Sequence, residues 1–134
     1  MPSFSQISLA KLSTCDIRLQ KLFMTVVMAY DCSILCGNRG EEEQNEAYAN
    51  GFSKKKWPNS KHNTMPSIAV DVAPYIGGRP ILNDRELLTL FAGYVLGTAE
   101  RLEIPIRWGG DWNGNWIVAD EKFQDLYHYE LKGV

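Results

Sequence analysis

The sequence is poor in the residues that most often carry catalysis or cross-links. Of its 134 residues only two are histidine and three are cysteine, and the formal net charge is -2. An odd number of cysteines without a Cys-x-x-Cys pair argues against a disulfide framework and against a cysteine-based zinc site. A charge so close to zero gives no general attraction to nucleic acid or to an anionic membrane surface, so neither is expected as a partner.

Long apolar segments are missing as well. The longest apolar stretch, residues 22–30, is far shorter than the roughly 20 residues that cross a bilayer, so we expect no membrane insertion. Residues 1–8 do not combine a basic start with an apolar run, and the sequence therefore predicts no secretion signal. The expected place of synthesis is the cytoplasm, and a substrate elsewhere would have to be reached with the help of another protein.

Length and pattern favour one domain of the α+β class, spanning residues 1–134. We expect a loosely ordered lead-in over residues 1–12, followed by amphipathic helices and short strands without the regular alternation of a βαβ fold. Helices are predicted at residues 14–30, 41–50 and 84–103, and strands at residues 33–36, 68–73, 106–108 and 127–131.

A long loop is predicted over residues 52–66. It contains three consecutive lysines at residues 54–56 and, further on, His62. A loop of this length inside a small domain is usually functional or disordered, and the histidine favours a function. The three lysines are expected to be a solvated stretch, with contact to an anionic polymer as the alternative.

Both histidines have neighbours suited to binding a metal. His62 lies nine residues before Asp71, a carboxylate in an otherwise apolar strand, where an unpaired charge is costly. His128 lies three residues after Asp125. Two imidazoles and one carboxylate suffice to hold a catalytic zinc with a position left for water. The pattern favours zinc ligands at His62, Asp71 and His128, with Asp125 as the base that acts on the water.

Simpler explanations exist for the same residues. A lone histidine is more often a surface or core residue than a ligand. Arg39, in a Gly-Asn-Arg-Gly turn, is suited to stabilising an oxyanion, but it is equally suited to pairing with the acidic run at residues 41–43. In the strand around Asp71, this side chain would point away from the Ile68 face only if a bulge intervenes. The tryptophans, more typical of a core than of a ligand platform, are Trp57, Trp108, Trp112 and Trp116.

Several segments match one family pattern when they are taken together. They are Gly37-Asn38-Arg39 with Glu43-Gln44, Trp57-Pro58-Asn59-Ser60-Lys61-His62-Asn63, Asp71-Val72-Ala73-Pro74-Tyr75, Arg107-Trp108-Gly109-Gly110-Asp111-Trp112 and Asp125-Leu126-Tyr127-His128. The chain thereby resembles the zinc D-Ala-D-Ala carboxypeptidase/L-alanyl-D-glutamate peptidase family, and most of all its small phage endolysins. The resemblance extends from about residue 12 to residue 131 and implies the hedgehog/D,D-peptidase type of α+β fold, a small antiparallel sheet flanked by helices.

The resemblance also implies roles for single residues. The residues that match the zinc ligands of the family are His62, Asp71 and His128. Asp125 falls at the position of the catalytic acid/base. Arg39 matches the arginine that positions or polarises the scissile carbonyl, and Ser60 matches the serine of the Ser-x-His motif at the substrate site. The segment between His62 and Asp71 is longer here than in the common family motif.

The function implied by this resemblance is hydrolysis of the peptide stem of bacterial peptidoglycan with Zn²⁺ as cofactor, most of all at the L-Ala-D-Glu bond. A monomer made in the host cytoplasm, without a separate wall-binding domain, would reach the wall after release by another protein. One alternative is a D-Ala-D-Ala carboxypeptidase or dipeptidase of wall metabolism. The other is a non-enzymatic wall-binding or structural phage protein, which would have no need of Asp125.

Overall fold

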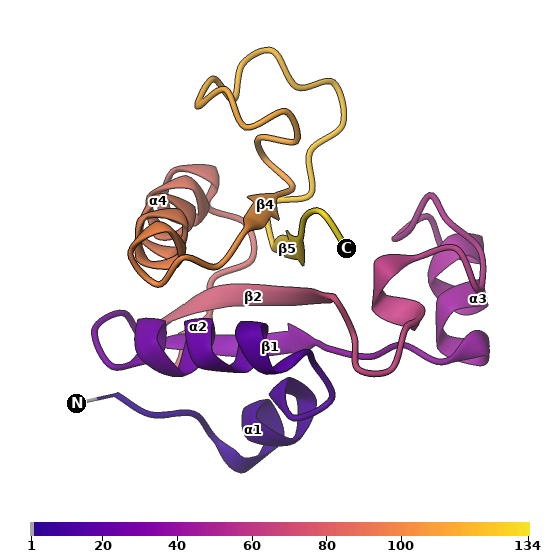
Figure 1. Ribbon diagram of the computed structural model, residues 1–134, viewed down its shortest axis with the longest axis horizontal. Helices are drawn as coiled ribbons and strands as arrows, with labels where there is room; N and C mark the ends of the chain where they lie inside the picture. Colours follow the sequence, from indigo (N-terminus) through magenta and orange to yellow (C-terminus); the bar gives the residue numbers. More distant parts are fainter. Residues whose placement is uncertain (1) are drawn as a thin grey trace.

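The computed structural model describes residues 2–134, which form an antiparallel sheet with helices packed around it (Figure 1). The strands are β1 (Cys32–Cys36), β2 (Ala69–Ile76), β3 (Arg79–Pro80), β4 (Ile106–Trp108) and β5 (His128–Leu131). They lie in the order β1-β2-β5-β4, with β3 paired to the end of β2, and all pairings are antiparallel. The predicted α+β class with a small antiparallel sheet is therefore confirmed.

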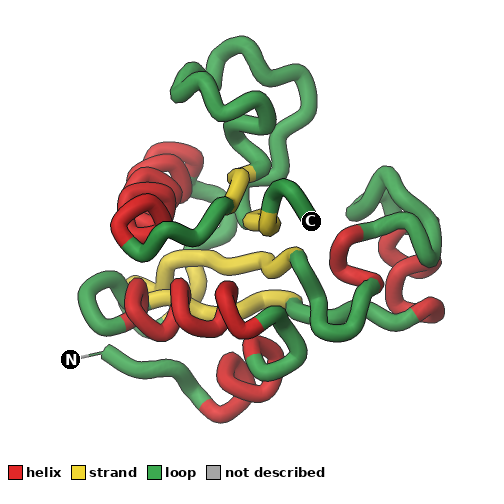
Figure 2. The backbone as a smooth tube through the Cα atoms, viewed as in Figure 1, coloured by secondary structure: helices red, strands yellow, loops and turns green. Residues whose placement is uncertain are grey.

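Three helices occupy the predicted places, with somewhat shorter ends: α2 (Ile17–Val27), α3 (Glu41–Ala49) and α4 (Arg85–Arg101). The sequence did not predict the other two, α1 (Gln6–Leu12) and the 3-10 helix η1 (Lys61–Asn63). Two long loops stand out in Figure 2, one between α3 and β2 and one between β4 and β5. Within residues 2–134, none of the helices combines the length and the apolar character needed to cross a membrane.

The N-terminal segment is more ordered than the sequence indicates. In place of the loosely ordered lead-in expected over residues 1–12, residues Gln6–Leu12 form α1. The hydroxyl of Ser5 caps this helix by accepting a hydrogen bond from the backbone of Ser8 at 3.2 Å. The buried Ser8 hydroxyl in turn accepts one from the backbone of Ile34 in β1, at 3.1 Å. With only two buried positions, α1 lacks the apolar periodicity by which a helix is predicted.

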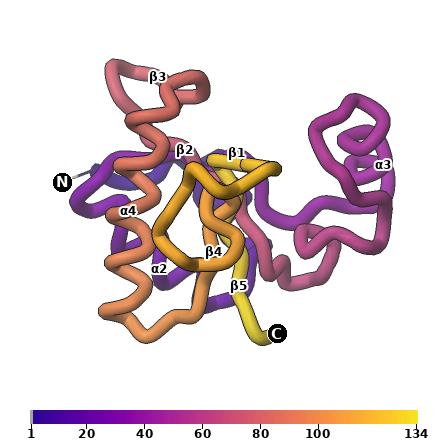
Figure 3. Tube along the Cα trace, turned by 90° about the horizontal axis from the view of Figure 1, so that it is seen from above, coloured from indigo at the N-terminus to yellow at the C-terminus, as the bar shows by residue number. Residues whose placement is uncertain are grey.

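The core lies between the sheet and the helices α2 and α4. The apolar face of α2 is buried, and Phe23 on this face packs edge-on against Tyr129 of β5 at 5.5 Å between ring centroids. Phe91 of α4 approaches the same tyrosine at 6.4 Å. Seen from above, α2 and α4 lie together on one side of the molecule, and α3 lies apart from them on the other (Figure 3). The helix α3 is therefore available for building a site outside the core.

Alternation along the two central strands separates the core from a polar face. Successive side chains of a strand point to opposite faces of the sheet. Tyr129 of β5 is buried in the core, so its neighbours His128 and Glu130 face the other way. Val70 and Val72 of β2 belong to the same core, and Asp71 between them faces the polar side.

The bulge lies in β1 and not in the strand of Asp71. Asp71 is three positions from Ile68, and an odd separation places two residues on opposite faces of a regular strand without any bulge. The pairing of β2 with β5 is accordingly uninterrupted, with Asp71 directly opposite His128. The register shift occurs instead in β1, between Ile34 and Cys36. The condition stated from the sequence, that Asp71 needs a bulge in its own strand to face away from Ile68, is therefore wrong.

Candidate functional site

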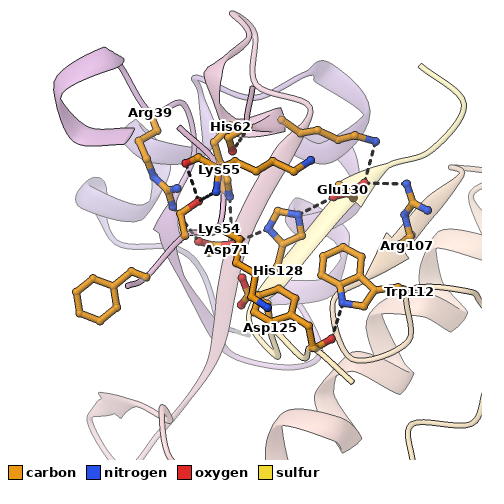
Figure 4. Close-up of a pocket in the computed structure, with 15 residues that line it drawn as sticks. Arg39, Lys54, Lys55, His62, Asp71, Arg107, Trp112, Asp125, His128 and Glu130 are labelled. Atoms are coloured by element: carbon orange, nitrogen blue, oxygen red, sulfur yellow. Dashed lines mark hydrogen bonds and ion pairs between the residues drawn. The ribbon is translucent and has the colours of Figure 1, made fainter. Parts of the chain in front are cut away.

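A pocket of about 470 Å³ opens beside the polar face of β2 and β5 (Figure 4). Its walls come from the sheet, from the long loop that follows α3 and from the loop between β4 and β5. The site residues that the sequence indicates all line it; they are Arg39, Ser60, His62, Asp71, Asp125 and His128. Residues distributed over some 90 positions of the chain therefore meet in one place (residues 39–128).

The two histidines converge on one carboxylate. Asp71 and His128 are a directly opposed pair on β2 and β5. Oδ1 of Asp71 lies 3.2 Å from Nδ1 of His128 and 3.3 Å from Nε2 of His62. The two imidazole rings are 5.1 Å apart between centroids. Nitrogens from η1 and β5 thus flank one carboxylate oxygen from β2.

The far nitrogen of each imidazole is held by an acceptor. Nδ1 of His62 lies 2.8 Å from the carbonyl oxygen of Gly37, and Nε2 of His128 lies 2.8 Å from Oε1 of Glu130. Carbonyl and carboxylate oxygens can only accept, so these two nitrogens carry the protons. In the neutral rings, the lone pairs of His62 Nε2 and His128 Nδ1 therefore face Asp71. Outer hydrogen bonds of this kind orient metal-binding histidines.

The site has the donor set of a divalent metal centre. Within the described residues, Nε2 of His62 is buried and has no hydrogen-bond partner, although Asp71 is so close. A buried nitrogen left unpaired beside a carboxylate fits a metal ion, which would accept both lone pairs. Ligand atoms of Asp71, Asp125 and His128 lie within 4.8 Å of one another, as do those of Cys36, His62 and Asp71.

Cys36 is the weaker ligand candidate of these residues. Its Sγ is 4.0 Å from Nδ1 of His62, the nitrogen that already donates to Gly37. A metal bound by Nε2 of His62 would lie on the other side of the ring. We therefore favour the combination of His62, Asp71 and His128 over one that includes the thiol.

Charge pairing shifts the pKa values of this cluster in its metal-free form. Burial disfavours the protonated form of His62, but the contact with Asp71 outweighs it and raises the pKa of His62 to about 10. At His128, burial likewise acts to lower the pKa, but the contacts with Asp71 and Glu130 outweigh it and raise the pKa of His128. The two imidazoles hold the pKa of Asp71 well below its usual range, although burial acts in the opposite sense. A metal ion at this carboxylate would replace the protons of the imidazoles.

Asp125 lies in the loop between β4 and β5, beside His128. Its backbone N–H donates to the carbonyl of Gly109 at 2.9 Å, and its carbonyl accepts from the backbone of His128 at 3.2 Å. A β-carbon at position 109 would overlap the Asp125 carbonyl, so glycine is what allows this close approach. Burial, and after it the charge of Asp71, raises the pKa of Asp125. A carboxyl group with a raised pKa is suited to exchanging a proton near neutral pH.

Arg39 and Ser60 also line the pocket. Nη2 of Arg39 lies 3.6 Å from Oδ2 of Asp71, and its Nη1 donates to the fully buried side chain of Gln44 in α3 at 3.0 Å. Arg39 therefore pairs with Asp71, whereas the sequence left a pairing with the acidic run at 41–43 open. The hydroxyl of Ser60 accepts from the backbone of His62 at 3.2 Å and so caps η1.

Glu130 is a site residue that the sequence motifs do not indicate. Its Oε2 accepts from Nζ of Lys61 at 2.9 Å and from Nη2 of Arg107 at 3.0 Å, while Oε1 accepts from His128. Burial acts to raise the pKa of Glu130, but His128 and, after it, Lys61 outweigh burial and lower this pKa to about 2. The sequence feature that could have identified Glu130 is its spacing of two residues from His128, because this spacing places both side chains on one face of a strand.

An aromatic wall completes the pocket next to His128. Trp112 stacks on Phe123 with 6.3 Å between ring centroids and 11° between ring planes. The Trp112 ring also lies 5.5 Å from that of His128. Of the tryptophans, Trp108 belongs to the core as expected, whereas Trp116 is 65% exposed. Trp112 was expected in the core and instead lines the site.

The lengthened segment between His62 and Asp71 leaves the site intact. Its residues 64–66 are exposed, so the extra chain extends outward. Ser67, which follows, is fully buried, and its backbone exchanges hydrogen bonds with Thr14 and Asp16 at 2.9 and 2.8 Å. The loop is thus anchored before β2 begins, and the insertion does not disturb the contact of His62 with Asp71.

The chain is similar to known proteins in sequence and in fold. A family model described as phage L-alanyl-D-glutamate peptidase matches residues 2–132. The L-alanyl-D-glutamate peptidase of Escherichia phage T5 is 34% identical over 133 residues, which cover 96% of this chain and 96% of that protein. The crystal structure of the Serratia marcescens L-Ala D-Glu endopeptidase ChiX shares the fold, with a TM-score of 0.75 at 21% identity over 97% of this chain and 90% of that one. The chain belongs to the phage L-alanyl-D-glutamate peptidase family.

Proposed function

We propose that this chain is a zinc-dependent endopeptidase that cleaves the L-Ala-D-Glu bond in the peptide stem of bacterial peptidoglycan. The observation that carries the proposal is the convergence of His62 Nε2 and His128 Nδ1 on the carboxylate of Asp71, at 3.3 and 3.2 Å, in the same pocket as Asp125. Membership of the family and the function of the T5 relative support the choice of bond.

The zinc ligands in this proposal are His62, Asp71 and His128. A bound zinc supplies Lewis acidity, which lowers the pKa of a water molecule to about 7 and polarises a carbonyl group. The chain's own contribution is orientation, because Gly37 and Glu130 hold the protonated nitrogens of the two imidazoles and leave the opposite lone pairs free. One carboxylate and two neutral imidazoles leave room for water and substrate at the same centre.

Asp125 is the acid/base of the proposed reaction. Its carboxylate takes a proton from the attacking water, whose oxygen forms a bond to the carbonyl carbon of alanine. As the C–N bond breaks, Asp125 passes the proton to the amine of glutamate, which leaves as a neutral group. Burial raises the pKa of Asp125, and this favours the protonated form that gives its proton to the leaving amine.

Arg39 and Ser60 act on the substrate in this scheme. The guanidinium of Arg39 lines the pocket next to Asp71, where it can donate to the carbonyl oxygen as negative charge develops there. Ser60 lines the same wall, so its hydroxyl is available to the peptide backbone of the stem. Gln44 keeps Arg39 in place through its hydrogen bond of 3.0 Å.

The biological role that follows is lysis of the host at the end of a phage cycle. A monomer would accumulate in the host cytoplasm and reach the peptidoglycan after another protein opens the membrane. The cut between L-Ala and D-Glu detaches the stem peptides from the glycan strands, and with them the cross-links that give the wall its strength.

Digestion of purified peptidoglycan, followed by mass spectrometry of the products, tests the proposal. We expect stem peptides that begin with D-Glu, their release to stop when a chelator is added, and zinc to restore it. Release of only terminal D-Ala would move the activity to a carboxypeptidase. Binding to the wall without any cleavage would favour a structural protein, and cleavage that persists in chelator would contradict the zinc dependence.

A further inference from the structure

The pocket carries an excess of positive charge in a chain that is slightly acidic. The net charge of the whole chain is -2, yet cationic side chains outnumber carboxylates among the residues that line the pocket. The cations are Arg39, Lys54, Lys55, Lys61 and Arg107, and the carboxylates are Asp71, Asp125 and Glu130. A bound zinc would add to this excess. A cleft lined by one sign of charge attracts ligands of the opposite sign, so an anionic ligand is favoured.

Three of the five cations already have a carboxylate partner inside the pocket. Arg39 pairs with Asp71 at 3.6 Å. Lys61 and Arg107 share Glu130, at 2.9 and 3.0 Å. The remaining cations are Lys54 and Lys55, and no ion pair within 4.0 Å involves either of them in the part of the chain that the structure describes. These two ammonium groups are therefore the ones free to receive an anion.

Lys54 reaches across the pocket to the end where Asp125 lies. Its Nζ is 4.2 Å from the ring centroid of Phe123, which belongs to the same loop as Asp125. In Figure 4 the Lys54 side chain runs toward Asp125, whereas Lys55 extends above His128. An aromatic ring attracts an ammonium group without neutralising its charge. Phe123 thus keeps the charge of Lys54 in place and available.

The chemistry of the substrate, under the proposed function, puts a carboxylate at this end. Because Asp125 protonates the amine of glutamate, the glutamate side of the scissile bond lies next to Asp125. Glutamate has two carboxyl groups, and a stem peptide uses only one of them to continue, so the other remains free. If the free group is the α-carboxyl, its carbon is only about 2.5 Å from the leaving nitrogen. A free carboxylate therefore lies within reach of Lys54.

We infer that Lys54, assisted by Lys55, binds the free carboxylate of D-glutamate and selects stem peptides in which this group is not amidated. This inference rests on the proposed function, since it assumes cleavage at the amine of glutamate. A primary amide has the same shape as the carboxylate but no charge, so it forms a weaker hydrogen bond with an ammonium group. The two lysines thereby determine specificity, and the hydrolytic step itself does not depend on them.

Two soluble muropeptides that differ only at this carboxyl group provide the test, one with the free acid and one with the primary amide. We expect wild-type kcat/KM to be about three- to tenfold higher for the acid, the range typical of a partly exposed charged hydrogen bond. Lys54→Met should reduce this ratio, and the double variant with Lys55→Met should bring it close to one. Lys54→Arg keeps the charge and should keep most of the preference.

Lys21→Met is the matched control, because it removes the same charge from an exposed position on α2, outside the pocket. It should leave the ratio at the wild-type value. A wild-type ratio close to one, or an unchanged ratio in the double variant, would overturn the inference while the L-Ala-D-Glu cleavage stands. Failure to cut this bond in either muropeptide would contradict the proposed function, and the inference with it.

Discussion

The strand wall and the loop wall of the pocket are built differently. The strand wall carries Asp71 and His128, paired in direct register, with core residues at the neighbouring positions of both strands. The loop wall carries Lys54 and Ser60 after α3, and Asp125 between β4 and β5. A metal needs ligands fixed to within fractions of an ångström, and strands provide this, whereas loops provide side chains that adapt to a polymeric substrate.

His62 departs from this division. It lies on the loop wall, yet its side chain is held in one position like the side chains of the strand wall. Its side chain is only 3% exposed. Three contacts hold its segment: Nδ1 to Gly37 at 2.8 Å, its backbone N–H to Ser60 at 3.2 Å, and its carbonyl to the backbone of Arg39 at 2.8 Å. A proposed ligand on a loop, such as His62, is thus held by additional hydrogen bonds of its own. The proposed ligands on the strands are held by the pairing of β2 with β5.

His128→Ala, on the strand wall, should have the largest effect. It removes one of the proposed ligands, so both zinc and lytic activity should be lost. Metal analysis after dialysis and the clearing of a suspension of wall-exposed cells measure the two quantities. A variant that retains one zinc per chain would remove His128 from the ligand set.

Asp125→Ala, on the loop wall, should separate metal binding from catalysis. We expect wild-type zinc content and melting temperature with a loss of about 10²- to 10⁴-fold in cleavage rate, the usual contribution of general acid/base catalysis. The same metal analysis and a peptide-cleavage assay measure this. Lysis at the wild-type rate would show that another group moves the proton.

Glu130→Ala should weaken zinc binding without abolishing it. Loss of the acceptor that orients a metal-binding imidazole typically costs about 10- to 100-fold in metal affinity. Competition with a chelating dye gives the affinity. Glu130→Gln is the comparison, since its amide oxygen can still accept from His128 and should restore part of the loss. Equal affinity in wild type and Glu130→Ala would show that the register of β5 alone orients His128.

The stability of the metal-free protein should fall as pH rises above 6.5. In the folded chain the pKa of His62 is raised from 6.5 to about 10, so its protonated form stabilises the fold fully below pH 6.5, and this stabilisation is lost progressively toward pH 10. Zinc competes with these protons, so the zinc-loaded protein should not show the decline. Melting temperatures between pH 6.5 and 9, with chelator and with zinc, measure the difference. Parallel curves would contradict it.

Ser60→Ala should have the smallest effect on the fold. The lost cap of η1 should lower the free energy of unfolding by about 1 kcal/mol, as at other helix N-termini. Urea denaturation measures this loss, and zinc content serves as the control. Full zinc content would show that the remaining contacts of His62 are sufficient, whereas loss of zinc would show that the loop wall depends on each single hydrogen bond.

Periodicity was enough to predict most of the sheet and the helices α2 and α4, and local chemistry indicated five of the residues that meet in the pocket, namely Arg39, His62, Asp71, Asp125 and His128. Their signals are local: an apolar stripe in α2, a carboxylate inside an apolar strand at Asp71, and histidines close to acidic residues. Ser60 was indicated only by the resemblance to the family. The short helix α1 has no such stripe, and its place depends on a contact between Ser8 and Ile34, far along the chain. Contacts of this kind are not encoded in any local pattern.

The role of Glu130 and the approach of Lys54 to Phe123 were equally hidden in the sequence. Glu130 meets Lys61 and Arg107 only because β4, β5 and η1 come together, and each of these residues alone resembles a solvated charge. The contact of Lys54 with Phe123 joins two loops that are 69 positions apart. Pairings between distant loops depend on tertiary packing, which a single sequence does not reveal.

Anomalous diffraction at the zinc edge, from crystals of the zinc-loaded protein, would test the metal centre most directly. The expected result is one peak bound by Nε2 of His62, a carboxylate oxygen of Asp71 and Nδ1 of His128, each at about 2.0–2.2 Å. A peak bound through Sγ of Cys36, or through the nitrogen of His128 that now donates to Glu130, would contradict the ligand set.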